Sequence, residues 1–283
     1  MNRVRVHDPR NCSLGEGPLW HPERKQLFWF DINNRRMLSR SGDEVLEWSF
    51  DAQVSAAGWV SRDELLIASE TGLFLFNLAT EERRHLCDLE ADNPATRSND
   101  GRADPQGGFW IGTMGKSAET GVGAIYRFHR GQLTRLYNGM TIPNSICFSP
   151  DGKAAFFTDT LTRQIMRQPL DAEGWPKGEP AVFIDLTEEG LNPDGSVVDA
   201  EGCLWNAQWG ASRVARYSPD GSFLSAVAIP ALQTSCSAFG GDGLRKLFVT
   251  SAAEGIESPS PAEGRTYSSI LTVSGQPEHR VVL

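Results

Sequence analysis

Short runs of apolar and aromatic residues recur along the chain at nearly regular intervals. Six runs begin at residues 27, 65, 109, 155, 204 and 247, so successive starts lie 38 to 49 residues apart. Most runs follow a turn cluster such as Ser149-Pro150-Asp151-Gly152, whose residue types supply the φ values and side-chain bonds of tight turns. Repeats of this length are typical of proteins built from stacked or radial units.

Each run is followed by segments in which apolar and polar residues alternate between turns. A third segment is visible at 72–76, 124–128 and 213–217, and a fourth at 45–48 and 181–184. Alternation with a period of two predicts antiparallel strands. The chain is therefore predicted to be all-β, a six-bladed β-propeller with four antiparallel strands per blade. A β-sandwich or barrel with coincidental spacing is the alternative.

The repeats extend over the whole chain without a linker, so residues 1–283 are expected to form a single propeller domain. Radial repeats escape the usual size limit of one core because each blade packs only on its neighbours. The segment Ser258-Pro259-Ser260-Pro261 is expected to be a surface loop inside the last blade. We further expect Val4-Arg5-Val6 to close the ring by pairing with residues 280–282.

Composition narrows the classes of partner. The net charge of −9 argues against nucleic acid and anionic membranes as partners, and leaves a small ligand or a cation. No targeting pattern and no run of 18 apolar residues is present, so a cytoplasmic protein is expected. Five cysteines without a C-x-x-C pair favour buried or free thiols over disulfides. The oligomeric state is left open, and a monomer is compatible with the sequence.

Four residues with oxygen-bearing side chains occupy the same position in four of the repeats. Each lies ten or eleven residues ahead of the apolar run of its repeat: Glu16, Asn99, Asn144 and Asp194. Equivalent positions in a circular repeat face one axis, so these side chains are expected to converge. Taken singly, each is also compatible with an ordinary turn residue. Two carboxylates and two amides suit Ca²⁺, Mg²⁺ or Mn²⁺ better than a thiolate-seeking metal.

Other site chemistries find less support. The five histidines are scattered and none occupies one of the four positions, which argues against a histidine zinc site and a Ser-His-Asp triad. No G-x-S-x-G motif is present. Gly121-x-Gly123 lacks the third glycine and the strand-to-helix context of a nucleotide-binding motif.

Short motifs over nearly the whole chain resemble, in content and order, those of the SMP-30/gluconolactonase/regucalcin family of six-bladed propellers. They are Leu14-Gly15-Glu16-Gly17-Pro18, Arg97-Ser98-Asn99-Asp100-Gly101, Gly112-Thr113-Met114, Ile142-Pro143-Asn144, Phe148-Ser149-Pro150-Asp151-Gly152, Thr158-Asp159 and Pro193-Asp194-Gly195. Each motif alone is weak, but the set together is specific.

The resemblance implies one divalent metal in the axial channel, held by Glu16, Asn144 and Asp194. Ca²⁺ is favoured, with Mg²⁺, Mn²⁺, Zn²⁺ and Fe²⁺ as alternatives. Asn99 is implied to lie nearby, bound to the metal through water or to the substrate.

The resemblance also implies a substrate-binding set. Arg97 and Asn99 would bind sugar hydroxyls, and Glu119 matches a less well-defined family position that contacts substrate. One departure is visible, because the family usually has glycine after the metal-binding asparagine and this chain has Ser145. Its hydroxymethyl group would either narrow the pocket or add a hydrogen bond.

The activity implied is hydrolysis of a sugar aldonolactone of the gluconolactone or pentonolactone type to the aldonic acid. The metal would polarise the lactone carbonyl. Either Asp194 would act as general base on the attacking water, or the metal would lower the pKa of that water.

Three alternative functions remain open at this stage. The protein could be a calcium-binding or other metal-binding regulatory protein with little turnover. It could be an interaction scaffold, although no exposed apolar patch is legible in the sequence. It could also hydrolyse other esters or organophosphates, which fits the polar pair Arg97 and Asn99 less well.

Overall fold

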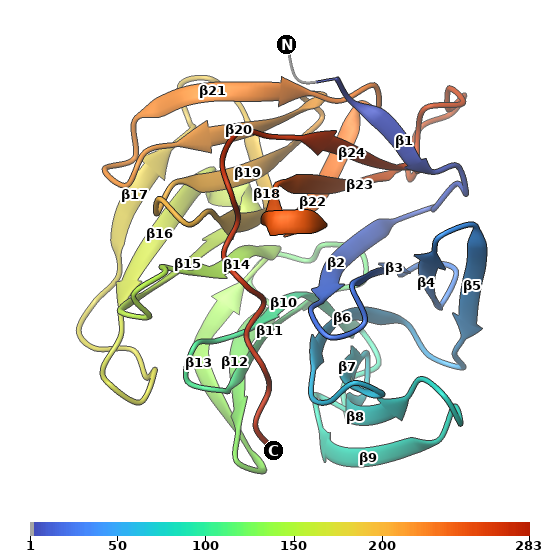
Figure 1. Ribbon diagram of the computed structural model, residues 1–283. Helices are drawn as coiled ribbons and strands as arrows, with labels where there is room; N and C mark the ends of the chain where they lie inside the picture. Colours follow the sequence, from blue (N-terminus) through green and yellow to red (C-terminus); the bar gives the residue numbers. More distant parts are fainter. Residues whose placement is uncertain (1–2) are drawn as a thin grey trace.

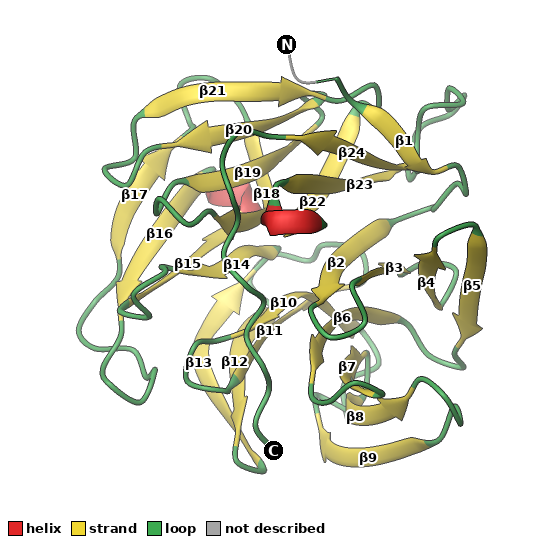
Figure 2. Cartoon of the chain, in the orientation of Figure 1, coloured by secondary structure: helices red, strands yellow, loops and turns green. Residues whose placement is uncertain are grey.

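Six four-stranded antiparallel sheets surround a central axis in the computed structural model, which describes residues 3–283 (Figure 1). The first strand of each sheet contacts the first strand of the next one, so these strands line the axis. The predicted all-β six-bladed propeller is confirmed. Helix is confined to two 3-10 turns, η1 (Thr160–Thr162) and η2 (Asp242–Leu244), in the described chain (Figure 2). Neither is long enough to cross a membrane.

The first three blades follow the chain from its N-terminal part. Blade 1 consists of β2 (Gly15–His21), β3 (Gln26–Asp31), β4 (Arg36–Ser41) and β5 (Glu44–Ser49). Blade 2 consists of β6 (Val54–Trp59), β7 (Glu64–Ser69), β8 (Gly72–Asn77) and β9 (Arg83–Asp88). Blade 3 consists of β10 (Thr96–Ala103), β11 (Phe109–Gly115), β12 (Gly123–His129) and β13 (Gln132–Met140).

The last three blades continue in the same order. Blade 4 consists of β14 (Pro143–Phe148), β15 (Ala154–Asp159), β16 (Gln164–Pro169) and β17 (Ala181–Asp185). Blade 5 consists of β18 (Asn192–Val198), β19 (Leu204–Trp209), β20 (Arg213–Tyr217) and β21 (Phe223–Ala228). Blade 6 consists of β22 (Gln233–Gly240), β23 (Lys246–Ala252), β24 (Thr266–Ile270) and β1 (Arg5–Asp8).

The six apolar runs are the second strands of the six blades, as the spacing predicts. In β3 every residue is buried, and Phe28, Trp29 and Phe30 are all inaccessible to solvent. Such a strand has a neighbouring sheet on each of its two faces, which explains why its residues are continuously apolar and do not alternate. The fourth strands lie at the rim and are largely exposed, as in β5 and β21.

The ring closes in blade 6, where β1 is the outermost strand beside β24. Arg5 pairs with Ser268 and Val6 with Tyr267 in antiparallel register. The prediction that the segment around Val4-Arg5-Val6 pairs with residues 280–282 is therefore wrong in its partner. Residues 281 and 282 instead bond to the backbone of blades 2 and 3, so they are not available to an outer strand.

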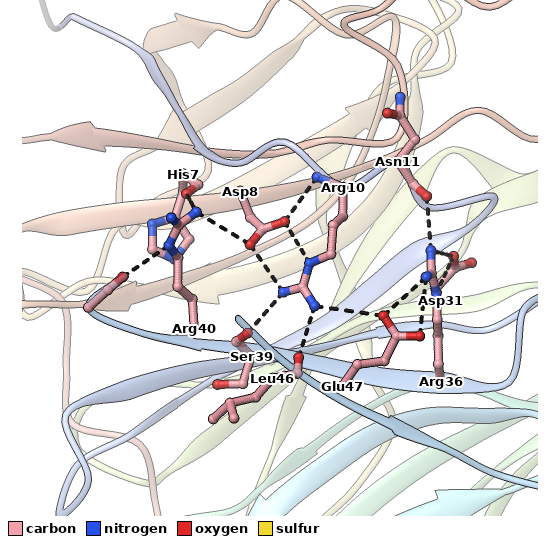
Figure 3. Close-up of polar contacts among 11 residues, drawn as sticks. His7, Asp8, Arg10, Asn11, Asp31, Arg36, Ser39, Arg40, Leu46 and Glu47 are labelled. Carbon is pink, nitrogen blue, oxygen red and sulfur yellow. Dashed lines mark hydrogen bonds and ion pairs between the residues drawn. The ribbon is translucent and has the colours of Figure 1, made fainter. Parts of the chain in front are cut away.

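Polar contacts join the closing strand to blade 1 (Figure 3). The buried carboxylate of Asp8 accepts two hydrogen bonds from the Arg10 side chain, at 2.9 and 3.1 Å, and one from Arg10 N at 3.0 Å. Arg10 also donates to the backbone oxygens of Ser39 and Leu46 in blade 1, both at 2.9 Å. Burial alone would raise the pKa of Asp8, but the bonds and charge of Arg10 prevail and lower it.

The C-terminal segment crosses the face of the ring at which the inner strands end (Figure 1). Gln276 donates to backbone oxygens of blades 4 and 5, Val281 N to blade 2 and Val282 N to blade 3. Glu278 forms an ion pair with Arg102 at 2.5 Å, with side chains 6% and 10% exposed. This tail therefore spans the axis and connects blades that are far apart in sequence.

Candidate active site

All six inner strands interrupt their pairing at the corresponding place, within their first three residues. The register breaks follow Glu16, Val54, Ser98, Asn144, Pro193 and Thr234. A β-bulge of this kind removes residues from the ladder and redirects their side chains. The repeated bulge explains how strand residues of four blades can face one axis.

The bulges bring the predicted residues together. A cavity of about 400 Å³, at the opposite end of the inner strands from the C-terminal tail, is lined by Glu16, Arg97, Asn99, Asn144 and Asp194. Arg97 Nη1 donates to Asn99 Oδ1 at 2.8 Å, and Asn99 Nδ2 donates to Asn144 Oδ1 at 3.0 Å. Five of the six residues predicted for the site thus share one cavity.

Two carboxyl groups in this cavity are held away from water. Asp194 Oδ1 is buried and has no hydrogen-bond partner among the described residues, while Glu16 Oε2 accepts a bond from Gly17 N at 3.0 Å. Burial, followed by the charge of Asp100, raises the pKa of Glu16 to about 8. Burial and the charge of Glu16 raise the pKa of Asp194 well above its usual value. A bound cation would relieve this cost of ionising both acids together.

Asp100 belongs to the family motif at residues 97–101, but the sequence predicts no role for it. Its fully buried carboxylate accepts a hydrogen bond from Ile146 N in blade 4 at 2.7 Å, and burial raises its pKa to about 6. This bond joins the inner strands of blades 3 and 4, next in sequence to Asn99 and close to Asn144. Asp100 therefore contributes to the position and the electrostatics of the site without lining its cavity.

Ser145 adopts a left-handed backbone conformation with a φ of +60° and is fully buried. Its hydroxyl donates to the backbone oxygen of Asp194 at 2.5 Å. It accepts bonds from Ser196 Oγ at 3.0 Å and from Asn206 Nδ2 at 3.3 Å. Of the two effects considered for this residue, the structure favours the added hydrogen bond, because Ser145 does not line the cavity.

Arg97 uses only one of its nitrogens on the protein. Nη1 donates to Ser98 O at 2.9 Å and to Asn99 Oδ1, and no protein acceptor for the other guanidinium N–H groups lies within the described chain. Burial lowers the pKa of Arg97, while the charges of Glu254, Glu16 and Asp194 act in the opposite direction. The free N–H groups are therefore available to a ligand in the cavity.

Glu119 lies outside the cavity. Its exposed carboxylate accepts a hydrogen bond from Ser117 N at 3.1 Å, and residues 116–118 of the same loop line the cavity in its place. Met114, Trp209 and Glu254, which sequence reasoning missed, also line it. They lie at or just after the ends of β11, β19 and β23, a topological relation that the blade pattern could have indicated.

A second group of possible ligands is found in blade 5. The ligand atoms of Asp199, Glu201 and Cys203 lie within 4.8 Å of one another. Arg216 already donates to Asp199 at 2.7 Å and to Glu201 at 2.7 Å, so its charge neutralises part of this cluster. These residues lie outside the axial cavity.

The fold and the site define the class of six-bladed propellers with an oxygen-rich cavity at one mouth of the axis. Within that class, residues 14–253 match the family described as SMP-30/gluconolactonase/LRE-like region. The chain belongs to this family, as the motifs in its sequence indicate.

Named relatives indicate the chemistry found in the family. The chain is 38% identical to an L-arabinolactonase of Azospirillum brasilense, over 90% of this chain and 86% of that protein. It is 34% identical to a pentonolactonase of Haloferax volcanii, over 99% and 98%. A crystal structure of a calcium-binding protein, regucalcin, from Agrobacterium tumefaciens is 42% identical with a TM-score of 0.97, over 100% and 98%. These relatives confirm the expected enzyme class of sugar lactonases at the level of the family.

Proposed function

We propose that the protein hydrolyses a sugar aldonolactone of the pentonolactone or gluconolactone type in the axial cavity, with the help of one divalent metal ion. The observation that carries the proposal is Asp194 Oδ1, a buried carboxylate oxygen with no hydrogen-bond partner in residues 3–283, beside Glu16 and Asn144. The names of the lactonase relatives support the same substrate class.

The donor set fits a hard divalent cation. Glu16, Asn144 and Asp194 would hold the ion with oxygen ligands only, and Ca²⁺ is the ion that such ligands and the calcium-binding relative favour. Mg²⁺, Mn²⁺, Zn²⁺ and Fe²⁺ are tested alongside it below. When bound, the ion would supply a Lewis acid for the lactone carbonyl.

The protein groups would position the substrate and move a proton. The free N–H groups of Arg97 form a planar donor fork that matches neighbouring hydroxyl oxygens of a sugar, and Asn99 extends this polar wall. Asp194 would accept a proton from the attacking water as its oxygen bonds to the carbonyl carbon. The ring C–O bond then breaks, and the ring oxygen takes up the proton to become a hydroxyl group of the aldonic acid.

A regulatory metal-binding protein is the second candidate, favoured by the calcium-binding relative. It shares the metal site but requires no turnover, so catalysis separates the two functions. A cytoplasmic location and a monomeric state stay predictions of the sequence.

The test is a proton-release assay of L-arabino-, D-xylono- and D-glucono-lactones with metal-stripped protein and each divalent ion restored in turn. We expect hydrolysis above the buffer rate on at least one lactone, lost with chelator. Glu16→Gln should abolish it, whereas the exposed Glu188→Gln should leave it unchanged. Hydrolysis that never exceeds the buffer rate, with metal binding intact, would leave the regulatory function as the better description.

Two further variants test the substrate side of the proposal. Arg97→Ala should raise KM, because Arg97 contacts the substrate through donors that the protein does not use. Glu119→Gln should have little effect in the observed conformation, in which its carboxylate faces its own loop. A strong rise in KM for Glu119→Gln would restore the role that the family resemblance implies for it.

A further inference from the structure

A second cavity lies at the seam between blade 6 and blade 1. Its volume is about 340 Å³, and it shares no residue with the axial cavity. It opens near the turns after β2 and before β23, which belong to the face of the ring that carries the C-terminal tail. The residues that shape it are His7, Trp20, Lys25, Arg40, Lys246 and Phe248.

The charges around this seam pocket are unbalanced. Three cationic side chains line it and no carboxylate does, although the whole chain has a net charge of −9. Lys25 and Lys246 form no ion pair with any residue between 3 and 283. Arg40 lies 3.7 Å from Asp8, but Arg10 already binds both oxygens of that carboxylate (Figure 3). The Arg40 guanidinium donates to Gly42 O at 3.0 Å and to His7 O at 3.4 Å, which leaves Nη2 for a ligand.

A neighbouring hollow increases the positive charge. It has a volume of about 330 Å³, shares Lys246 with the seam pocket and is also lined by Arg3 and Arg5. Burial, followed by the charge of Arg5, lowers the pKa of Lys246. An anion placed beside Lys246 would reverse this electrostatic penalty.

Aromatic side chains form the floor of the seam pocket, and the rings of Trp20 and Phe248 are called its carbon floor below. The rings of Trp20 and Phe248 stack at 5.6 Å with an angle of 16° between their planes, and Lys246 Nζ lies 4.8 Å from the Phe248 ring. His7 packs edge-on against Phe248 at 4.8 Å. Burial and the charge of Lys246 lower the pKa of His7 to about 4, so the ring is neutral at pH 7.

A ring nitrogen of His7 is the remaining polar group at the carbon floor. His7 Nε2 is buried and has no hydrogen-bond partner among residues 3–283. Buried ring nitrogens are normally satisfied, so such an atom beside an open cavity is a position for a ligand oxygen. Positive charge, a carbon floor and an unused hydrogen-bonding atom thus coincide in one place.

We propose that the seam pocket binds a small organic phosphate, with the phosphate held by Lys25, Arg40 and Lys246 and the organic part placed on Trp20. A phosphate dianion matches the two lysines that form no ion pair among residues 3–283, with Arg40 beside them, whereas a carboxylate matches one positive charge. A pocket of this volume is at the lower end of the range for small-molecule sites, which suits a phosphorylated sugar. Bound there, the ligand would connect the closing strand to blade 1.

Calorimetric titration in phosphate-free buffer at low salt tests the proposal. The probes are ribose 5-phosphate, inorganic phosphate, ribose and gluconate. We expect ribose 5-phosphate to bind saturably, more tightly than inorganic phosphate, and the two uncharged or carboxylate probes to bind much more weakly. Loss of a charge-assisted bond of about 1.5 kcal/mol corresponds to about a tenfold loss of affinity, which is expected for Lys25→Gln and for Lys246→Gln.

Lys177→Gln is the matched control, because Lys177 is exposed on the loop before β17 and only its backbone forms hydrogen bonds within residues 3–283. The Lys177→Gln variant should bind ribose 5-phosphate with the same affinity as the unmodified protein. Circular dichroism and thermal unfolding establish that each variant is folded.

Several results would overturn the proposal. One is the absence of saturable binding of either phosphate probe up to about 10 mM, the weak limit of specific recognition. Another is equal binding by Lys25→Gln, Lys246→Gln and the control. Gluconate binding that is tighter than that of ribose 5-phosphate and is weakened by Lys246→Gln would reject the phosphate class, because gluconate held in the axial cavity would not respond to this variant. Equal affinities for ribose 5-phosphate and inorganic phosphate would reject the role of the carbon floor.

Discussion

At the buried residue Ser145, the backbone conformation is unfavourable while the side-chain hydrogen bonds are stabilising, and two substitutions separate these effects. Its backbone has a φ of +60°, which is unfavourable for any residue with a Cβ atom. Its hydroxyl connects blade 4 to blade 5 through Asp194 O and Ser196 Oγ. Alanine keeps the strain and removes the hydroxyl, whereas glycine removes both. Asp194 O retains one bond in either variant, from Asn206 Nδ2 at 3.0 Å.

The expected changes in the free energy of unfolding follow from these hydrogen bonds and from the backbone strain. Each variant loses one donated and two accepted hydrogen bonds. The longest of these comes from Asn206 Nδ2, which keeps its bonds to Asp194 O and Ser196 Oγ. At about 1 kcal/mol for each of the two shorter bonds, Ser145→Ala should lower the free energy of unfolding by about 2 kcal/mol. Glycine relieves about 1–2 kcal/mol of left-handed strain and adds about 0.5–1 kcal/mol of backbone entropy. Ser145→Gly should therefore cost only about 1 kcal/mol.

Urea unfolding of metal-free protein measures both variants. Ser212 provides a matched control, because it also has a positive φ, of +54°, and its hydroxyl forms no hydrogen bond within residues 3–283. Ser212→Gly should stabilise the protein slightly, because the strain it relieves exceeds the backbone entropy it adds and no hydrogen bond is lost, and Ser212→Ala should be neutral. Metal titration should show weakened binding in both Ser145 variants, because both loosen the backbone of Asp194.

Either of two results would contradict the roles given to the Ser145 hydroxyl and to its backbone strain. If Ser145→Ala has the same stability and metal affinity as the unmodified protein, the hydroxyl does not support Asp194. If Ser145→Gly is less stable than Ser145→Ala, left-handed strain is not the cost that separates them.

Further predictions concern the same site and the tail. Asp194→Asn should weaken the metal affinity at least about tenfold in a calorimetric titration, because it removes a buried charge that faces the ion. Metal-free protein should lose stability as the pH rises from 4.5 to about 8, because the raised folded-state pKa of Glu16 favours the protonated form, and urea midpoints should show added metal flattening this decline. Glu278→Gln should lower the free energy of unfolding by about 3–5 kcal/mol, since it leaves Arg102 buried without its partner. Arg97→Ala should raise KM more than it lowers kcat in steady-state kinetics, because Arg97 acts through substrate binding.

The fold was predictable because a strand that is buried on both faces has a continuous apolar sequence, which is easy to recognise. Residues 27–29 and their equivalents are continuously apolar in five blades, and blade 5 keeps the shorter pair Leu204-Trp205, so the spacing of the runs indicates six units. The axial residues were predictable for the same reason, since repetition places Glu16, Asn144 and Asp194 at equivalent positions.

Other features depend on contacts that the sequence does not record. Segment 4–6 and segment 280–282 are both short and rich in valine, so their composition cannot show which one joins β24. The bulges that redirect the axial side chains arise from pairing between strands. The orientation of Glu119 depends on a bond to its own loop, which no pattern of residue types predicts.

The closing strand has a consequence for how the ring is made. During synthesis β1 leaves the ribosome before its partner β24, which follows about 260 residues later. At translation rates of roughly 5–20 residues per second, the exposed ladder of β1 waits for tens of seconds. Arg3, Arg5 and Arg10 give this orphan segment a strong positive charge, and charged edge residues discourage pairing with the wrong strand. The N-terminal arginines would thus protect the newborn chain until its last blade exists.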